Sequence, residues 1–164
     1  MDQAGLDALY GAADAVVSLH RSEGFGLVIA EAMLRGVPVV ATGWSGSTDF
    51  LSEATGLPIG YDLVPAVDPQ DTYDFSETVW AEPRIEEAAQ ALGLLRSDPA
   101  RARSLGESAA AFAAAAFGPA AYAEAIGCLC RPYALDFGKG SLSIRAPQGA
   151  RCMIGKRLNS IVED

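Results

Sequence analysis

The residues best suited to chemistry form the stretch Glu23-Gly24-Phe25-Gly26, which follows the short apolar run 15–19. Gly24 and Gly26 allow a backbone to approach a ligand closely and to adopt conformations that other residues avoid. The apolar segment that begins at Phe25 predicts a helix directly after this turn. In an open α/β sheet, ligands bind where strands end and helices begin, and the N–H groups of a helix start suit a phosphate.

Two carboxylates frame the turn. Glu23 precedes the predicted helix, and Glu31 lies eight residues later, inside a segment that is nearly all apolar until Arg35. A carboxylate at such a position is costly unless it is hydrogen-bonded, and its two oxygens can accept from a pair of vicinal hydroxyls. A ribose diol has that geometry. The residues alone therefore suggest a site for a nucleotide that carries a sugar and a phosphate.

The spacing Glu23-x7-Glu31, with Gly-Phe-Gly between, resembles the E-x7-E motif of retaining glycosyltransferases of the GT-B fold, family 4. The similarity runs over about residues 5–110. A bare E-x7-E is a weak signal, whereas E-G-F-G-x4-E followed by G-x-P-V-V-A-T is a strong one. Further similar segments are 36–42, 43–46, 48–50, 63–65 and 80–83.

The resemblance implies a role for each residue of the motif. Glu31 would hydrogen-bond the ribose hydroxyls, and Glu23 would be the catalytic residue, contacting hydroxyls of the transferred sugar without acting as a covalent nucleophile. The backbone of Gly24, Phe25 and Gly26 would contact the sugar and pyrophosphate, with Leu27 beside the nucleotide. The family also implies transfer with retention of configuration, no metal and no cofactor, and the sequence contains no Asp-x-Asp motif.

The sequence departs from the family pattern at its start. Such enzymes have two Rossmann-like domains, and this chain resembles part of the C-terminal, donor-binding one. We expect a fragment that requires a further N-terminal acceptor domain, with the acceptor itself unknown. The family's basic pair for the pyrophosphate has no counterpart except Arg21, a weak candidate. The isolated chain is therefore expected to be inactive; the alternative is a remnant that binds a nucleotide-sugar or a partner without chemistry.

Alternating elements place the motif in an α/β fold, a partial Rossmann-like parallel sheet with flanking helices. Buried strands are predicted at 15–19, 37–41 and 57–61, because these runs are short and apolar. Helices are predicted at 3–13 and 25–35, the second closed by Gly36. Ser47–Glu53 predicts one or two helical turns, with Ser47 or Thr48 as the cap.

The second half predicts a different organisation. Residues 62–83 carry three prolines and few periodic positions, which predicts an extended excursion. Helices follow at 84–96, at 98–117 with Asp98 as cap, and at 119–129, giving an Ala-rich helical C-terminal part. The first of these should bury Ile85, Ala88, Ala89, Leu92 and Leu95. The expected domain covers residues 1–130, and 131–164 form an unassigned tail.

Composition limits the partners and the compartment. The chain has 164 residues and a net charge of −9, which argues against binding nucleic acid or anionic membranes. We expect neither a signal peptide nor a transmembrane segment, which would need a run of about 20 apolar residues. Three cysteines, Cys128, Cys130 and Cys152, are odd in number and lack the spacing of a zinc or redox pair. Reduced structural thiols in a cytoplasmic protein are expected.

Several residues keep two interpretations. His20 is either a packed loop histidine or a base, Trp44 either packs or lines the sugar pocket, and Asp49 either caps a helix or faces the sugar. The alanines at 109–116 indicate close helix packing. The basic residues Arg145, Arg151, Lys156 and Arg157 indicate a solvated tail or a contact with an acidic surface.

Two other classes of protein fit less well. A dinucleotide-dependent oxidoreductase would need Gly-x-Gly-x-x-Gly after a strand, which is absent. A purely helical structural protein conflicts with the strand, loop and helix order of the first 60 residues.

Overall fold

The computed structural model describes residues 2–67, 69–70, 77–130, 134–138 and 141–145. Its contacts divide the chain into two compact units, Met1–Ala116 and Phe117–Asp164. The first unit contains every residue predicted for the site. The predicted domain boundary at residue 130 remains a prediction.

The first unit is built on a three-stranded parallel sheet in the order β1-β2-β3. The strands are β1 (Val16–Ser18), β2 (Val39–Thr42) and β3 (Leu57–Ile59), with Val16 opposite Val39 and Val40 opposite Leu57. All four residues of β2 are buried, as expected for an apolar run in the middle of a parallel sheet. The predicted α/β fold with a parallel sheet is thereby confirmed.

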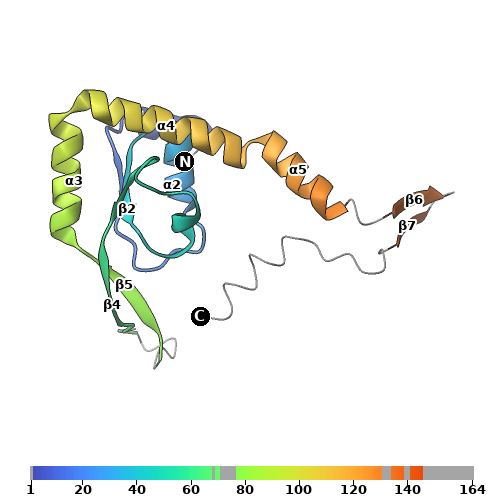
Figure 1. Ribbon diagram of the computed structural model, residues 1–164, viewed down its shortest axis with the longest axis horizontal. Helices are drawn as coiled ribbons and strands as arrows, with labels where there is room; N and C mark the ends of the chain where they lie inside the picture. Colours follow the sequence, from blue (N-terminus) through green and yellow to red (C-terminus); the bar gives the residue numbers. More distant parts are fainter. Residues whose placement is uncertain (1, 68, 71–76, 131–133, 139–140, 146–164) are drawn as a thin grey trace. The chain divides into compact units, whose positions relative to one another are not determined.

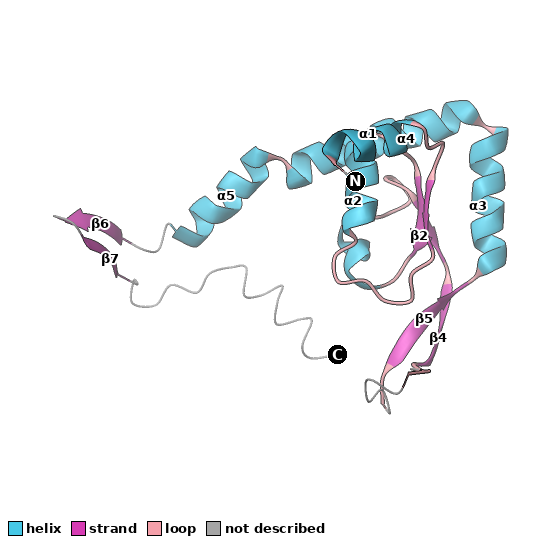
Figure 2. Ribbon diagram, turned by 180° about the vertical axis from the view of Figure 1, so that it is seen from behind, coloured by secondary structure: helices cyan, strands magenta, loops and turns pink. Residues whose placement is uncertain are grey.

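Helices cover both faces of this sheet. Figures 1 and 2 show the sheet between α2 (Leu27–Leu34) and α3 (Ile85–Ser97). The helix α1 (Gln3–Gly11) packs on the α2 side, where the Tyr10 hydroxyl donates to the backbone oxygen of Val28 at 3.4 Å. Gly36 ends α2 with a φ of +71°, the left-handed conformation predicted for that position.

The core on the α3 side joins Val40, Ile59, Ala88 and Leu95. The predicted buried face of α3 is right at Ala88 and Leu95 but wrong at Ile85, Ala89 and Leu92, which are exposed. The sheet is only three strands wide, so a narrower strip of the helix is covered than its apolar pattern suggests.

The helix α4 (Pro99–Phe117) starts as predicted. The Asp98 carboxylate accepts a hydrogen bond from the backbone N–H of Arg101 at 2.9 Å, the arrangement of an N-cap. Ala109 and Ala113 are fully buried, which confirms the close packing predicted for two of these alanines. The helix passes very near the end of α2, since a Cβ on Gly106 would collide with the carbonyl oxygen of Gly36.

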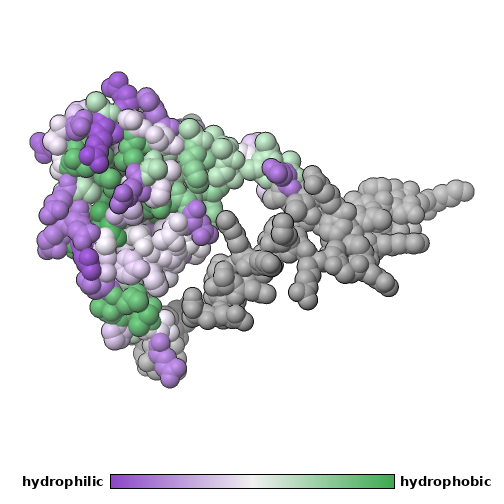
Figure 3. All heavy atoms as spheres, in the orientation of Figure 1, coloured by the Kyte–Doolittle hydropathy of each residue, from purple (hydrophilic) through white to green (hydrophobic). Residues whose placement is uncertain are grey.

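Residues 61–83 contain regular structure that the sequence did not predict. The expected extended excursion includes two paired antiparallel strands, β4 (Tyr61–Pro65) and β5 (Val79–Pro83). Pro65 and Pro83 occupy the last positions of the two strands, where a missing N–H is tolerated, and Pro69 lies in a turn. The predicted strand 57–61 also divides at Gly60, whose N–H donates to a carboxylate oxygen of Glu87 at 2.8 Å. Figure 3 shows an apolar patch over this hairpin, which exposes Leu63 and Val79.

The second unit contains α5 (Pro119–Cys130), β6 (Ala134–Gly138) and β7 (Ser141–Arg145). The two strands are antiparallel, with Ala134 opposite Arg145. The helix agrees with the prediction for 119–129, and the hairpin adds regular backbone to the region left unassigned. Cys152, Arg151, Lys156 and Arg157 lie outside the described residues.

Candidate functional site

The loop between β1 and α2 lies at the carboxyl end of the parallel sheet. It ends at Gly26, which precedes α2 with φ +91° and ψ +50°, a left-handed conformation. A Cβ at this position would lie 3.2 Å from the Cβ of Ser47 and 3.4 Å from the Phe50 ring. Both the backbone angle and the crowding require glycine here, so the predicted conformational role of Gly26 is confirmed.

A second loop, which follows β2, supports the first. The N–H of Gly46 donates to the backbone oxygen of Glu23 at 3.1 Å. The Ser45 hydroxyl donates to the same oxygen at 2.6 Å and accepts from the N–H of Glu23 at 3.3 Å. The loop around Glu23 is therefore held by the Gly46 backbone and the Ser45 hydroxyl of the neighbouring loop.

His20 joins the same two loops. One ring nitrogen, Nδ1, lies 3.1 Å from the Ser18 hydroxyl, and the other, Nε2, lies 3.1 Å from the backbone oxygen of Trp44. A carbonyl only accepts, so Nε2 donates to Trp44, and in the neutral imidazole Nδ1 then accepts from the Ser18 hydroxyl. Both nitrogens thus hold the scaffold, which favours the packed histidine over the base.

The two carboxylates occupy different surroundings. Glu23 is half-buried in the loop, and no partner among the described residues holds its carboxylate. Glu31 lies on α2, one helical turn after the exposed Leu27, with its side chain 40% exposed. A carboxylate oxygen of Glu31 lies 3.9 Å from the Arg35 guanidinium, one further turn along. Leu27, Glu31 and Arg35 therefore follow one face of the helix.

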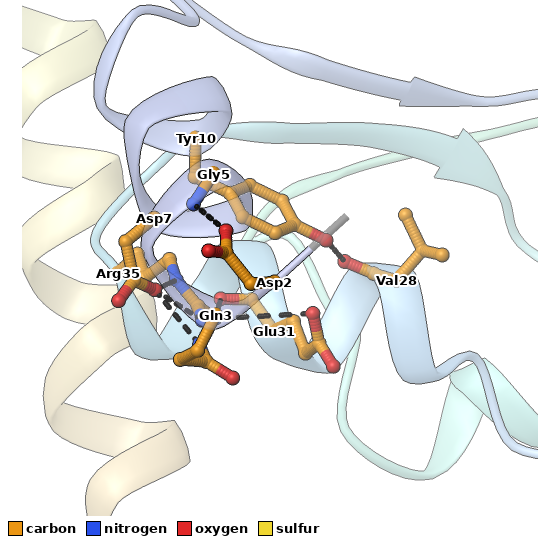
Figure 4. A network of polar contacts seen from close by, with 8 residues as sticks. All are labelled: Asp2, Gln3, Gly5, Asp7, Tyr10, Val28, Glu31 and Arg35. Atoms are coloured by element: carbon orange, nitrogen blue, oxygen red, sulfur yellow. Dashed lines mark hydrogen bonds and ion pairs between the residues drawn. The ribbon is translucent and has the colours of Figure 1, made fainter.

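A polar network connects this face of α2 with α1 (Figure 4). The Arg35 guanidinium donates to one Asp7 carboxylate oxygen at 2.7 and 3.0 Å and stacks 4.7 Å above the Tyr10 ring. Burial and the charge of Glu31 raise the pKa of the Tyr10 phenol, whereas the Arg35 hydrogen bond lowers the pKa of Asp7. The sequence does not mark Asp7 and Tyr10 as site residues, because their partner lies in a distant part of the chain.

Arg21, the weak candidate for the pyrophosphate, is engaged elsewhere. Its Nε lies 2.6 Å from a Glu82 carboxylate oxygen, and its guanidinium sits 4.9 Å from the centre of the Trp80 ring. Its backbone oxygen also accepts from the N–H of Ala81. Arg21 thus connects the loop between β1 and α2 to β5.

Three further candidates, Phe25, Trp44 and Asp49, lie in the loops that follow β1 and β2. Phe25 is 43% exposed, with its ring 5.1 Å from that of the buried Phe50. Trp44 packs against Tyr61 with the ring centres 5.1 Å apart, which supports its packing role. The predicted helical turns form a 3-10 helix, Ser45–Asp49, preceded by Trp44 and without a side-chain cap. The capping predicted for Ser47 or Thr48 is therefore wrong, and Asp49, exposed at its end, caps no helix.

The geometry suits an anion at the start of α2. No side chain in the described part of the chain caps this end, so the first backbone N–H groups remain for a ligand. The helix dipole adds about 0.3–1 kcal/mol per charge at an exposed terminus. Among the described residues, no three His, Cys, Asp or Glu side chains gather in a way that could hold a metal ion. No described helix is both long and apolar enough to cross a bilayer.

The chain is similar to known proteins over most of its length. A family model described as family 4 glycosyltransferase in conflict systems matches residues 1–125. The solved structure of sucrose-phosphate synthase from Thermosynechococcus elongatus is similar, with 32% sequence identity and a TM-score of 0.58. The match covers 80% of this chain but only 28% of that synthase. No curated protein matches the chain significantly.

The parallel sheet and its flanking helices thus correspond to part of a GT-B enzyme. The family model covers most of the chain, including the whole loop and helix that carry the two carboxylates. The chain belongs to family 4 of the glycosyltransferases.

Proposed function

We propose that this chain supplies the donor site of a retaining, metal-independent glycosyltransferase and binds a nucleotide-sugar at the loop between β1 and α2. The observation that carries the proposal is the left-handed Gly26 at the uncapped start of α2. It turns backbone N–H groups toward the carboxyl edge of the sheet, where a diphosphate is accommodated without basic side chains. Membership of family 4 supports a nucleotide-sugar as the ligand.

Glu31 is assigned to the ribose. Its side chain is 40% exposed and lies one turn after Leu27, whose exposed side chain would contact the nucleotide. The two carboxylate oxygens can accept from the 2′- and 3′-hydroxyls together. Hydrogen bonds to a charged group contribute about 1.5–3 kcal/mol each, enough to matter for a ligand held mainly by backbone.

Glu23 is assigned to the transferred sugar. Its backbone is fixed by Ser45 and Gly46, while its carboxylate remains available for sugar hydroxyls. The backbone of Gly24, Phe25 and Gly26 would line the sugar and the pyrophosphate. Because retention in this family is expected without a covalent intermediate, incubation with a nucleotide-sugar should add no glycosyl mass to the chain. A stable adduct on Glu23 would contradict this role.

A second candidate is binding without transfer, which the engagement of Arg21 favours. Arg21, a cation within the loop, is paired with Glu82 and stacked on Trp80. The diphosphate would then be held by backbone groups alone, and donor affinity would be modest. Binding of a nucleotide-sugar without its turnover, with any sugar acceptor, would select this candidate.

The test is a calorimetric titration of the chain with UDP, GDP and ADP. Glu31→Ala should weaken the tightest nucleotide about tenfold or more, because it removes both acceptors for the ribose hydroxyls. Glu107→Ala, on an exposed position of α4, is the matched control and should bind as the wild type does. Equal affinities for the wild type and Glu31→Ala would overturn the ribose assignment.

A further inference from the structure

Arg35 links the carboxylate of Glu31, on α2, to the helix α1. One guanidinium nitrogen, Nη1, donates to the backbone oxygen of Glu31 at 3.1 Å and lies 3.9 Å from its carboxylate. The other two nitrogens, Nε and Nη2, both donate to one oxygen of Asp7. The guanidinium therefore makes two contacts with Glu31 and two with Asp7 of α1.

The far side of this link is itself fixed. Asp7 also accepts from the Gln3 amide at 3.0 Å, and Asp2 caps α1 by accepting from the N–H of Gly5 at 2.9 Å. Tyr10 is only 6% exposed and places its ring under the guanidinium. Figure 4 shows these groups gathered beside Glu31. Arg35 is thus held in one orientation by a planar stack and a fork of hydrogen bonds.

The side chains of Arg35 and Glu31 differ in their exposure to solvent. The Arg35 side chain is 24% exposed and the Glu31 side chain is 40% exposed. The cation is the more covered of the two, and the carboxylate is the more accessible to a ligand. A free glutamate side chain samples several rotamers, so a fixed positive neighbour restricts where its carboxylate rests.

Charge gives Arg35 a second effect on the same site. A nucleoside diphosphate is strongly negative, and the chain itself carries a net charge of −9. A bare carboxylate at the ribose would repel the diphosphate across a short distance. Arg35 offsets the charge of Glu31 while leaving its oxygens as acceptors.

We infer that Arg35, anchored by Asp7 and Tyr10 on α1, is a positioning residue that orients the Glu31 carboxylate for the ribose hydroxyls of the donor. The inference rests on the proposed function. It assigns to α1, which contributes nothing to the E-x7-E motif, a part in recognising the sugar of the nucleotide. Arg35 acts through Glu31 and does not touch the ligand.

The experiment compares UDP, GDP and ADP with their 2′-deoxy counterparts, using the full chain and calorimetry. The wild type should prefer the ribonucleotide of the best base. Arg35→Met should lose most of that preference by weakening the ribonucleotide about tenfold, while the affinity for the 2′-deoxynucleotide stays within twofold. Arg35→Lys, which keeps the charge but not the fork, should retain part of the preference. Arg103→Met, at an exposed position of α4, is the control and should behave as the wild type does.

A double substitution separates positioning from general destabilisation. Glu31→Ala combined with Arg35→Met should discriminate no worse than Glu31→Ala alone, because Arg35 acts through the missing carboxylate. Asp7→Asn leaves the guanidinium in place and loosens its anchor, so it should lower the ribonucleotide preference even where Arg35→Met fails to fold.

The outcomes distinguish the two proposals. If Glu31→Ala abolishes the ribose preference while Arg35→Met and Asp7→Asn keep it, the positioning role is wrong and the donor site stands. An equal loss of affinity for both nucleotides in Arg35→Met also overturns the positioning role, because that is the signature of a structural residue. If no nucleotide binds, or Glu31→Ala leaves the preference unchanged, the donor site itself is overturned, and the inference with it.

Discussion

The backbone of Gly46 lies directly against the carbonyl group of Gly24, so closely that no side-chain carbon fits between the loops that follow β1 and β2. The contact is reinforced on either side by the N–H of Gly46 and the hydroxyl of Ser45, both of which bond to the oxygen of Glu23. The conformation of the proposed sugar-binding loop therefore depends on a residue 20 or more positions later in the chain.

The contact between these two glycines predicts that a methyl group added to Gly46 lowers the free energy of unfolding more than one added to Gly24. A Cβ on Gly46 would collide with the Gly24 carbonyl, whose backbone cannot rotate away without breaking the Glu23 bonds. Gly46→Ala should therefore lower the free energy of unfolding by about 2–3 kcal/mol. The measurement is the urea midpoint at constant m-value.

Gly24→Ala is the matched control from the other side of the contact. A Cβ there would meet no described atom within 4 Å. Its cost in unfolding free energy should stay below about 1 kcal/mol, as for ordinary surface substitutions. Nucleoside diphosphate affinity should nevertheless fall, because the added methyl group would occupy space in which the ligand is proposed to contact the protein backbone. A stability loss equal to that of Gly46→Ala would contradict the one-sided contact.

Two glycines inside helices give opposite predictions for one substitution. Gly93 lies in α3 with no described atom within 4 Å of an added Cβ, so Gly93→Ala should stabilise the chain by about 0.5–1 kcal/mol through helix propensity. Gly106 lies in α4 against the Gly36 carbonyl, and Gly106→Ala should destabilise despite the same gain in propensity. Thermal unfolding of both variants checks the prediction. A stabilising Gly106→Ala would show that α4 does not pack as closely as observed.

The parts of the site that the sequence predicts are those set by local backbone needs. Gly26 and Gly36 adopt left-handed conformations that few other residues tolerate, so their roles follow from residue type alone. The strands 16–18 and 39–42 follow from short, mostly apolar runs. Each of these signals lies within a few residues of the feature that it predicts.

The missed features depend on contacts between distant residues. The hairpin β4–β5 joins Tyr61 to Pro83 across a proline-containing stretch, so no periodicity marks it in advance. Arg35 meets Asp7 across 28 positions, and neither residue type nor spacing points to the pair. The exposed Leu92 shows the same limit, because the width of the sheet decides which face of α3 is covered.

The pair of Arg21 and Glu82 should contribute little to stability. Their side chains are 49% and 43% exposed, so solvent screens the charges, and a double-mutant cycle should give a coupling of about 1 kcal/mol or less. The variants are Arg21→Gln, Glu82→Gln and both together. Coupling should shrink further in 1 M salt.

The same variant tests whether Arg21 serves the ligand. Because its guanidinium is paired with Glu82 and stacked on Trp80, Arg21→Gln should leave nucleoside diphosphate affinity within about twofold, equal to the control Arg96→Gln at an exposed position of α3. A tenfold loss in Arg21→Gln alone would show that the cation leaves Glu82 to hold the diphosphate.

The link between α1 and α2 predicts a specific dependence on acid. The Arg35 hydrogen bond holds the pKa of Asp7 below its ordinary value near 3.8. A carboxyl group whose pKa is lowered by folding stabilises the native state above the unfolded pKa, and this contribution is lost as the pH falls through the folded pKa. Asp7→Asn should therefore be less stable than the wild type at pH 5–7, and the difference should close below pH 3.8.

Urea unfolding at each pH measures this difference in stability. The control is Asp49→Asn, at an exposed position without a salt bridge in the described chain. A gap between wild type and Asp7→Asn that stays constant down to pH 2 would mean that the ion pair with Arg35 is not its source.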